Sequence, residues 1–267
     1  MGNECKPYVG VSGISTVKEA RKVISIFKET GFNLKARSMP MVGLQLLSES
    51  LGSVFGASRR SPDLEQLPDI LKLVNLDVFS TIHYSTADAW SFVKDIEAIL
   101  NIDEIYEQGL VGGLQINRIL PSEKQVQKLR DNYPKLKLIL QISPIITDTI
   151  NIHLLSKRLA TSYPKFDYLL IDASLGTGTE LNENYCSVTY RAIRENGVTT
   201  PVVFAGGLSG SNVRSKVNQL KNSIKEGFSI DAEGSLRDKL GEGYGNDVLN
   251  MEKVSAYLAG ASEMLLK

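Results

Sequence analysis

The sequence has 267 residues, of which 42% are hydrophobic and 22% are charged. Thirty basic residues balance thirty acidic residues, so the net charge provides no general attraction to nucleic acid or to a membrane surface. The opening residues MGNECKPYVG hold no apolar run suited to a signal peptide, and no stretch is long and apolar enough to span a bilayer. The spacing of Cys5 and Cys186 predicts neither a disulfide framework nor a metal site. We therefore expect a cytoplasmic protein with no metal, no nucleic-acid partner and no membrane partner.

Apolar runs of strand length alternate with helix-length segments along the chain. The expected strands lie at 7–12, 38–47, 76–84, 109–117, 136–143, 166–174, 200–207 and 228–234. The expected helices lie at 16–31, 87–100, 125–133 and 251–266, and another begins between residues 184 and 187. The helix at 87–100 carries the apolar residues Trp90, Val93 and Ile96.

This alternation predicts parallel strands joined by right-handed crossovers. Eight such units in a chain of this length predict a closed (β/α)8 TIM barrel, for which about 250 residues are typical, and we expect one domain. The alternative is an open doubly wound sheet, but no G-x-G-x-x-G follows the first strand, which favours the barrel. The segment Leu44–Pro68 is too long for a plain connection and is expected to hold a loop over the site.

Glycines follow the seventh expected strand, in the stretch TPVVFAGGLSGSNV, and a small-residue turn follows the eighth. Gly206 and Gly207 end the seventh strand, and Gly234 and Ser235 follow the eighth. Active sites of (β/α)8 barrels lie at the carboxyl ends of the strands, with phosphate often bound after strands seven and eight. Each turn alone is typical of a tight connection, but the pair on consecutive strands predicts a phosphate site.

An aspartate ends the apolar run of the sixth expected strand, in LLIDASLGTGTE. Asp172 is placed to present an acid or a base to a substrate, and Gly176 and Gly178 allow a loop to close over a ligand. The alternative is a buried structural cap. The next helix begins more than ten residues later, which makes a capping role less suitable.

Four motifs in chain order resemble those of one enzyme family. VSGIS at 11–15 stands where that family has a Lys-Ile-Cys-Gly-Ile-Thr strand, and GLQIN at 113–117 is similar to its Gln-Leu-His-Gly strand. LLIDASLGTG at 169–178 resembles its Leu-Leu-Asp strand and Gly-Gly-Thr-Gly loop, and VVFAGGLSGSNV at 202–213 its Leu-Ala-Gly-Gly-Leu-x-x-x-Asn-Val. SIDAEGS at 229–235 loosely matches its Val-Asp-x-Ser-Ser-Gly. The family is phosphoribosylanthranilate isomerase, a (β/α)8 enzyme of tryptophan biosynthesis.

The resemblance implies an Amadori rearrangement, in which a phosphoribosyl amine becomes a ketose phosphate without any cofactor. It gives Asp172 the role of general acid. The family's general base is a cysteine, and that position is Ser12 here, whose hydroxyl needs an activating group to act as a base. His83, at the end of the third strand, is a candidate base either directly or through Ser12, although a structural histidine is the simpler interpretation.

The same resemblance assigns the remaining contacts. Asn117 stands where the family has a histidine, and a substrate carboxylate would be bound by Arg59 or Arg60, with Arg37 as a third candidate. The phosphate would lie on a set of small residues, namely Gly178, Gly206, Gly207, Gly234 and Ser235. The expected partner is a phosphorylated sugar, and the expected assembly is a monomer or a homodimer.

Two other functions remain open at this point. One is a different phosphosugar enzyme on the same scaffold, and the other is a binding or regulatory protein that has lost catalysis. Ser12 favours these alternatives, because it replaces the family's base. Asp172 favours an enzyme, since a protein that only binds phosphate does not need that acid.

Overall fold

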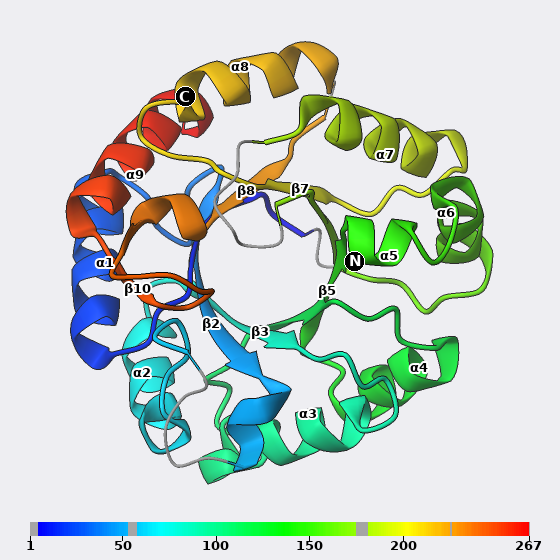
Figure 1. Cartoon of the computed structure of the whole chain (residues 1–267), viewed down its shortest axis with the longest axis horizontal. Helices are drawn as coiled ribbons and strands as arrows, with labels where there is room; N and C mark the ends of the chain where they lie inside the picture. The colour runs from blue at the N-terminus through cyan, green and yellow to red at the C-terminus, as the bar shows by residue number, and fades with distance from the viewer. Residues whose placement is uncertain (1–4, 53–57, 175–180, 225, 267) are drawn as a thin grey trace.

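Eight parallel strands form a closed barrel in the computed structural model, which describes residues 5–52, 58–174, 181–224 and 226–266. They follow one another around the ring in chain order, and β8 pairs with β1 (Figure 1). The strands are β1 (Tyr8–Ser12), β2 (Met39–Leu47), β3 (Phe79–Ser85), β4 (Gly113–Asn117), β5 (Lys137–Ile142), β6 (Tyr168–Asp172), β7 (Val202–Ala205) and β8 (Ser229–Ala232). The predicted (β/α)8 barrel is confirmed, and the open sheet is excluded because β1 and β8 are paired.

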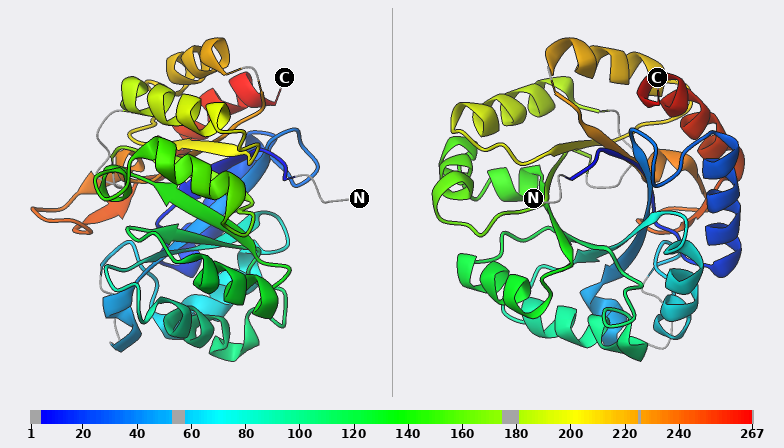
Figure 2. Two further views of the ribbon diagram at one scale, coloured as in Figure 1. Left: turned by 90° about the vertical axis from the view of Figure 1, so that its right-hand side faces the viewer. Right: turned by 180° about the vertical axis from the view of Figure 1, so that it is seen from behind.

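The helices form an outer ring around these strands (Figures 1 and 2). They are α1 (Val17–Glu29), α2 (Leu67–Val74), α3 (Phe92–Leu100), α4 (Glu123–Asn132), α5 (Pro144–Thr147), α6 (Ile152–Thr161), α7 (Glu183–Glu195), α8 (Val213–Ser223) and α9 (Met251–Leu265). Short 3-10 turns are η1 (Ser48–Gly52), η2 (Leu64–Gln66), η3 (Ile102–Glu104) and η4 (Gly234–Leu236). The amino terminus of α4 is capped by Ser122 and Gln125, which form a reciprocal capping box.

Two apolar cores result from the alternation of side chains along each strand. Outward residues such as Val11 and Phe204 join the helices in the larger core. Inward residues near the amino-terminal ends fill the lower barrel, where Tyr8 packs edge-on against Tyr168 with ring centroids 5.2 Å apart and lies 6.0 Å from Phe79. The lower interior is therefore a packed aromatic plug.

The upper interior, nearer the carboxyl ends, is polar. Two inward-facing glycines make room for its larger side chains: a Cβ at Gly10 would lie 2.4 Å from Asp231 Oδ1, and one at Gly43 only 2.6 Å from Ser12 Oγ. A Cβ at Gly43 would also lie 2.5 Å from His83 Cε1. Because real Cβ atoms do not approach so closely, glycine is required here for the polar groups to reach the barrel axis.

A hairpin that sequence reasoning did not predict follows β8. Its strands, β9 (Arg237–Lys239) and β10 (Asp247–Leu249), are antiparallel and project beyond the barrel (Figure 2, left). Arg60 anchors it, with Nη2 2.5 Å from Asp247 Oδ2 and Nη1 2.8 Å from Glu233 Oε1. Arg237 also pairs with Asp247, so a buried ion cluster holds the hairpin against the end of β8.

Some predicted boundaries need correction. Helix α3 begins at Phe92 rather than Ala87, because Asp88 Oδ1 accepts a hydrogen bond from the backbone N–H of Trp90 and holds a turn there. Trp90 precedes this helix and is 95% exposed, so the prediction that the helix carries it is wrong. In the segment Leu44–Pro68, β2 extends to Leu47 and α2 begins at Leu67, while residues 53–57 lie outside the described residues.

Candidate active site

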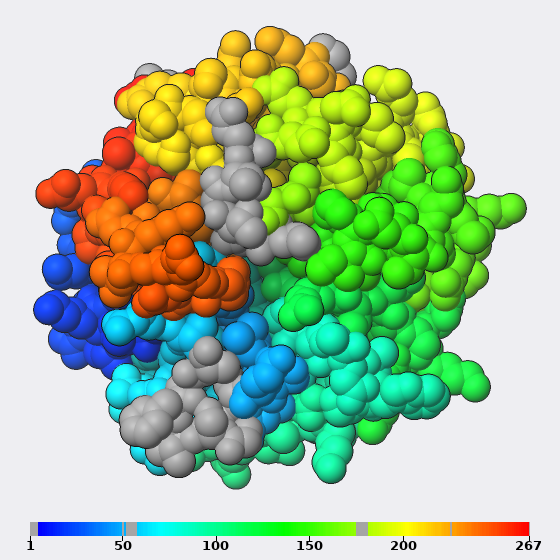
Figure 3. All heavy atoms as spheres, in the orientation of Figure 1, coloured from blue at the N-terminus to red at the C-terminus, as the bar shows by residue number. Residues whose placement is uncertain are grey.

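A cavity of about 510 Å3 opens at the carboxyl ends of the strands, within the size range of ligand sites, about 300–1,000 Å3. In the space-filling view it is the hollow near the centre of this face (Figure 3). Charged and amide side chains dominate its lining: Gln45, Glu49, Gln115, Asn117, Arg118, Gln141, Asp172, Asp231 and Glu233. His83, Ser85, Ser174, Gly206, Gly207, Gly234 and Tyr244 also line it, with apolar contributions from Leu47, Ile145, Leu170 and Ala205.

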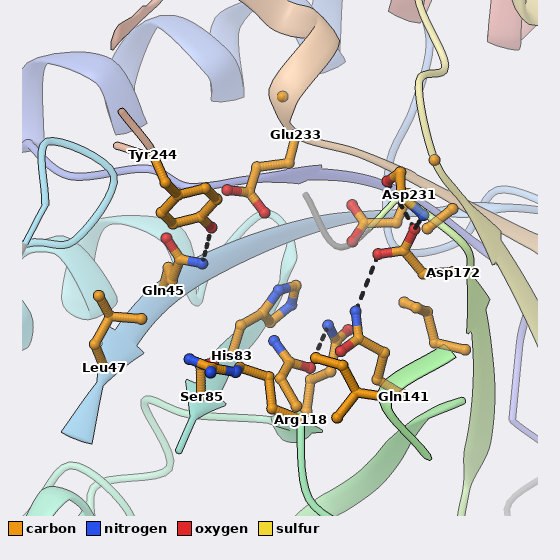
Figure 4. A pocket seen from close by; sticks show the side chains of 18 of the residues that line it. Gln45, Leu47, His83, Ser85, Arg118, Gln141, Asp172, Asp231, Glu233 and Tyr244 are labelled. Carbon is orange, nitrogen blue, oxygen red and sulfur yellow. Dashed lines mark hydrogen bonds between the residues drawn. The ribbon is translucent and has the colours of Figure 1, made fainter. Parts of the chain in front are cut away.

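Two aspartates stand in one row across β6, β7 and β8. Asp172 pairs in register with Ala205, and Ala205 pairs with Asp231. Neighbouring strands lie about 4.8 Å apart, so the two aspartate Cα atoms are separated by about 10 Å, with β7 between them. Both carboxyl groups line the cavity (Figure 4). We refer to Asp172, Ala205 and Asp231 as the acidic row.

Asp172 is held by three hydrogen bonds. Its Oδ1 accepts from the backbone N–H and from the hydroxyl of Ser174, each at 2.7 Å, and its Oδ2 accepts from Gln141 Nε2 at 3.0 Å. Asp172 is a buried residue, with 4% of its surface exposed. These contacts fix its orientation toward the cavity, as an acid or base at this position requires.

The pKa of the Asp231 carboxyl is strongly raised. Burial raises the pKa of its carboxyl to about 8, and the nearby charges of Glu233 and Asp172 add to the rise, while the hydrogen bond from Ser12 opposes it. Asp231 is 5% exposed. A carboxyl with such a pKa exchanges its proton near neutral pH, which is the property expected of a catalytic acid or base.

Ser12 lies beneath this carboxyl. Its hydroxyl donates to Asp231, 2.8 Å from Oδ1 and 3.0 Å from Oδ2, and the residue is 1% exposed. Ser12 therefore points into the barrel, but it is not among the residues that line the cavity. The group at the cavity surface is Asp231, which sequence reasoning did not select as a site residue.

A neutral row faces the acidic row. Gln45 pairs in register with His83, and His83 pairs with Gln115, across β2, β3 and β4. Burial lowers the pKa of His83 to about 3, so its ring is uncharged at neutral pH, and its Nε2 lies 2.9 Å from Thr81 Oγ1. Gln45 Nε2 donates to the Tyr244 hydroxyl at 2.7 Å. We refer to Gln45, His83 and Gln115 as the neutral row.

Asn117 extends this wall toward the mouth. Its Oδ1 accepts from Gln115 Nε2 at 3.1 Å, and its side chain lines the cavity. Its neighbour Arg118 also lines the cavity and has a left-handed backbone with φ of 68°, a conformation that favours glycine. Among the described residues that line the cavity, Arg118 is the only lysine or arginine.

The glycines predicted to bind phosphate are partly assembled at the mouth. Gly206 and Gly207 have φ of 118° and 58° and line the cavity, and Asn212 Nδ2 donates to the Gly207 carbonyl. Gly234 lines the cavity as well. Ser235 does not, and its hydroxyl donates to the Leu208 carbonyl instead. Gly178 lies outside the described residues.

The arginines predicted to bind a carboxylate lie elsewhere. Arg60 is 4% exposed and is paired with Asp247 and Glu233, and its guanidinium lies 4.3 Å from the ring centroid of Tyr244. Arg59 is exposed, and its backbone contacts the hairpin at Gly245. Arg37 precedes β2 and so lies toward the opposite end of the barrel. None of the three lines the cavity.

The site residues that sequence reasoning missed share one signal. Gln45, Gln115, Gln141 and Asp231 are each a polar residue inside a strand, directly flanked by apolar residues, at a position that the alternation turns inward. Scanning each strand for such a residue would have found them. Tyr244 has no comparable signal, because it lies in a glycine-rich hairpin.

The described residues contain no group of three or more histidine, cysteine, aspartate or glutamate side chains arranged to hold a metal ion. The described part of the chain also contains no helix with the length and apolarity needed to cross a membrane.

No protein-family model and no curated protein sequence matches this chain. Similar solved structures include phosphoribosyl anthranilate isomerase from Thermus thermophilus, with 14% identity, a TM-score of 0.61, and coverage of 96% of this chain and 98% of that chain. TrpF from Jonesia denitrificans has 15% identity, a TM-score of 0.60, and coverage of 97% and 98%. Tryptophan synthase from M. tuberculosis has 10% identity, a TM-score of 0.61, and coverage of 99% and 94%. At these identities the similarity shows the barrel fold that the chain shares with them.

Proposed function

We propose that the chain is an acid–base enzyme that isomerises a phosphoribosyl amine to a ketose phosphate. One observation carries the proposal: the acidic row places the carboxyls of Asp172 and Asp231 in one cavity, on either side of β7, the strand that Gly206 and Gly207 follow. A sugar phosphate whose phosphate meets these glycines would lie with its ring between the two carboxyls. The motif resemblance to phosphoribosylanthranilate isomerase supports the same reaction.

The two carboxyls would divide the proton transfers. Asp172 gives a proton to the ring oxygen while the bond from that oxygen to C1 breaks, and the nitrogen lone pair forms a C=N bond. The carboxylate form of Asp231 then takes the proton from C2, the C–H electrons form the C1=C2 bond of an enol, and the C=N electrons return to nitrogen as its lone pair. The enol hydroxyl loses its proton as C1 gains one, which yields the C2 ketone.

Asp231 thus takes the role that the resemblance gives to the position of Ser12. Its carboxyl reaches the cavity, whereas the Ser12 hydroxyl donates to that carboxyl from below. A base with a pKa of about 8 removes a proton from carbon better than an ordinary carboxylate does, because basicity increases with pKa. Ser12 is then a positioning residue that orients Asp231.

The phosphate would be bound by backbone N–H groups. Gly206 and Gly207 carry no side chain, so an anion can approach their backbone closely, and their positive φ angles turn successive N–H groups toward one side. Gly234, at the end of the neighbouring strand β8, completes the same rim. This is where phosphate is often bound in (β/α)8 barrels.

The test is turnover of phosphoribosylanthranilate, followed by the loss of its fluorescence, together with calorimetric binding of ribose 5-phosphate. We expect Asp172→Asn and Asp231→Asn to reduce kcat at least a hundredfold, because a positioned acid or base contributes about 10²–10⁴-fold. Ser12→Ala should retain more activity than either, and kcat/KM of the wild type should rise as the pH approaches 8.

Two results would contradict the proposal. If ribose 5-phosphate fails to bind, the phosphate assignment is wrong. If it binds but the two asparagine variants turn over substrate as the wild type does, the acidic row is not catalytic. Binding without turnover of any phosphoribosyl amine would favour the alternatives, another phosphosugar enzyme or a non-catalytic binding protein.

A further inference from the structure

The neutral row contains two buried polar atoms without a partner. Gln45 Oε1 and Gln115 Oε1 have no hydrogen-bond partner, although these residues are 6% and 3% exposed. Both side chains line the cavity. A buried polar atom that loses its hydrogen bond is destabilising, so native proteins pair almost all such atoms, and two in one row point to a ligand.

Reversing either amide does not remove the unpaired atom. Gln45 has one contact, with the Tyr244 hydroxyl, and this hydroxyl can donate or accept. Gln115 has one contact, with the Asn117 amide, and reversing both amides restores it with donor and acceptor exchanged. In every arrangement, one polar atom of each glutamine remains for a ligand.

The position of this row relative to the acidic row identifies which part of the ligand it meets. In the ring of eight strands, β3 lies opposite β7, so the neutral row faces Ala205 and the glycines that follow it. Figure 4 shows Gln45 and His83 across the cavity from Asp172 and Asp231. In the proposed reaction, the phosphate lies at Gly206 and Gly207, and C1 and C2 lie between the carboxyls. The nitrogen substituent on C1 then extends away from the phosphate, toward β3.

We propose that the neutral row binds a polar nitrogen substituent, so that the substrate is a phosphoribosyl amine whose substituent hydrogen-bonds to Gln45 and Gln115. This inference rests on the proposed function. An aryl ring makes no hydrogen bond to the amides, and the carboxylate of anthranilate only accepts hydrogen bonds, so neither pairs with Gln45 Oε1 and Gln115 Oε1. Hydroxyl, amino or carboxamide groups can donate to these two atoms. The uncharged ring of His83 is compatible with a neutral polar substituent, since it neither repels nor attracts a charge strongly.

The experiment compares two substrates in the full-length protein. One is phosphoribosylanthranilate, and the other is a phosphoribosyl amine whose nitrogen carries an aliphatic chain with a carboxamide. Turnover is measured with each substrate. Calorimetric binding is measured with the ketose product of each substrate. We expect the carboxamide compound to bind at least tenfold more tightly and to have the higher kcat/KM.

Gln45→Met and Gln115→Met keep the side-chain length and remove its hydrogen-bonding atoms. Each should weaken binding of the carboxamide compound about tenfold and binding of phosphoribosylanthranilate by a smaller factor, because one hydrogen bond is lost only where one was made. The matched control is Gln127→Met on α4, where an exposed glutamine is hydrogen-bonded to Asp131. This variant should bind both compounds as the wild type does. Thermal unfolding of each variant excludes misfolding as the cause.

The outcomes distinguish a failure of this inference from a failure of the proposed function. If neither compound nor ribose 5-phosphate binds, the proposed function fails and the inference falls with it. If ribose 5-phosphate binds but phosphoribosylanthranilate binds as tightly as the carboxamide compound, only the inference is overturned. Equal losses for both compounds in the methionine variants would overturn it as well, because they would indicate a structural role for the two glutamines.

Discussion

The lower and upper halves of the barrel interior are built from the same eight strands and are chemically opposite. In the lower half, the rings of Tyr8, Phe79 and Tyr168 pack together. In the upper half, Asp172 and Asp231 occupy inward positions near the carboxyl ends of their strands. The lower half is mainly apolar, with the buried Tyr8 hydroxyl unpaired, whereas the upper half holds two unpaired amide oxygens and a carboxyl with a raised pKa.

This difference separates stability from function along the barrel axis. The aromatic plug contributes free energy of folding through burial, and none of its three rings lines the cavity. The upper half contains groups whose burial opposes folding, which persist when function requires them. Four predictions follow the contrast from its largest expected effect to its smallest.

Removing one ring of the plug should have the largest effect on stability. Tyr168 is 1% exposed and contacts both Tyr8 and Phe79. We expect Tyr168→Ala to lower the free energy of unfolding by about 3–5 kcal/mol, because it creates a cavity and loses buried area. Urea denaturation measures this change. Trp90→Ala, a change at a 95% exposed aromatic, should stay within about 0.5 kcal/mol, and an equal loss there would contradict the contrast.

The pH dependence of stability should have opposite signs in the two halves. Because the pKa of Asp231 is raised to about 8, folding favours its protonated form, so its contribution is full below pH 4 and is lost as the pH rises toward 8. The wild type should therefore lose about 1.4 kcal/mol per pH unit from this group between pH 5 and 7. Asp231→Asn should abolish that slope in urea denaturation at each pH.

Asp167, just before β6, provides the opposite case in the lower half. Burial raises its pKa, but the backbone N–H of Leu138 and the guanidinium of Arg130 outweigh burial and hold the pKa below its usual value. Its contribution is present at neutral pH and is lost as the pH falls through the lowered pKa. Asp167→Asn should therefore destabilise the protein at pH 7, and identical slopes for both variants would refute the assignment.

Arg118→Gly should change stability little. Its φ of 68° is unfavourable for a side-chain-bearing residue by about 1–2 kcal/mol, whereas the greater freedom of glycine in the unfolded chain offsets about 0.5–1 kcal/mol of the relief. We expect a free energy of unfolding within about 1 kcal/mol of the wild type, together with weaker calorimetric binding of ribose 5-phosphate derivatives that carry an anionic substituent. A clear loss of stability with unchanged binding would make Arg118 a structural residue.

His83 should show no titration at all near neutral pH. Its pKa of about 3 predicts a constant ring chemical shift between pH 5 and pH 8 in proton–carbon NMR spectra. His153, exposed on α6, is the other histidine of the chain, so His83→Gln identifies which signal belongs to which residue. A shift change for His83 with a midpoint near 6.5 would mean that the neutral row is charged at acidic pH.

The sequence predicted the barrel because each strand is a short, strongly apolar run, and local runs of this kind are visible without tertiary information. It did not predict the hairpin, since RDKLGEGYGNDVL mixes charges with three glycines and lacks a strand pattern over most of its length. The pairing of Arg60 with Asp247 joins residues 187 positions apart, and no local pattern indicates it.

The candidate site was predicted in part, and the reason is again physical. Asp172 ends β6 and Gly206 and Gly207 follow β7, and strand ends can be located in a linear sequence. The family resemblance assigns the base to the position of Ser12, and only the folded ring brings β1 beside β8 and joins Ser12 to Asp231. Register, which decides which side chains meet, is set by the closed barrel and not by any single strand.

The pairing of β1 with β8 has a consequence for how the chain is made. Val9 pairs with Ile230, so the first and last barrel strands meet only after the six strands between them have been synthesised. Until then β1 and the most recently made strand are open edges that can pair with strands of other molecules. The growing sheet is therefore exposed to aggregation until β8 is available, and closure of the barrel removes both edges at once.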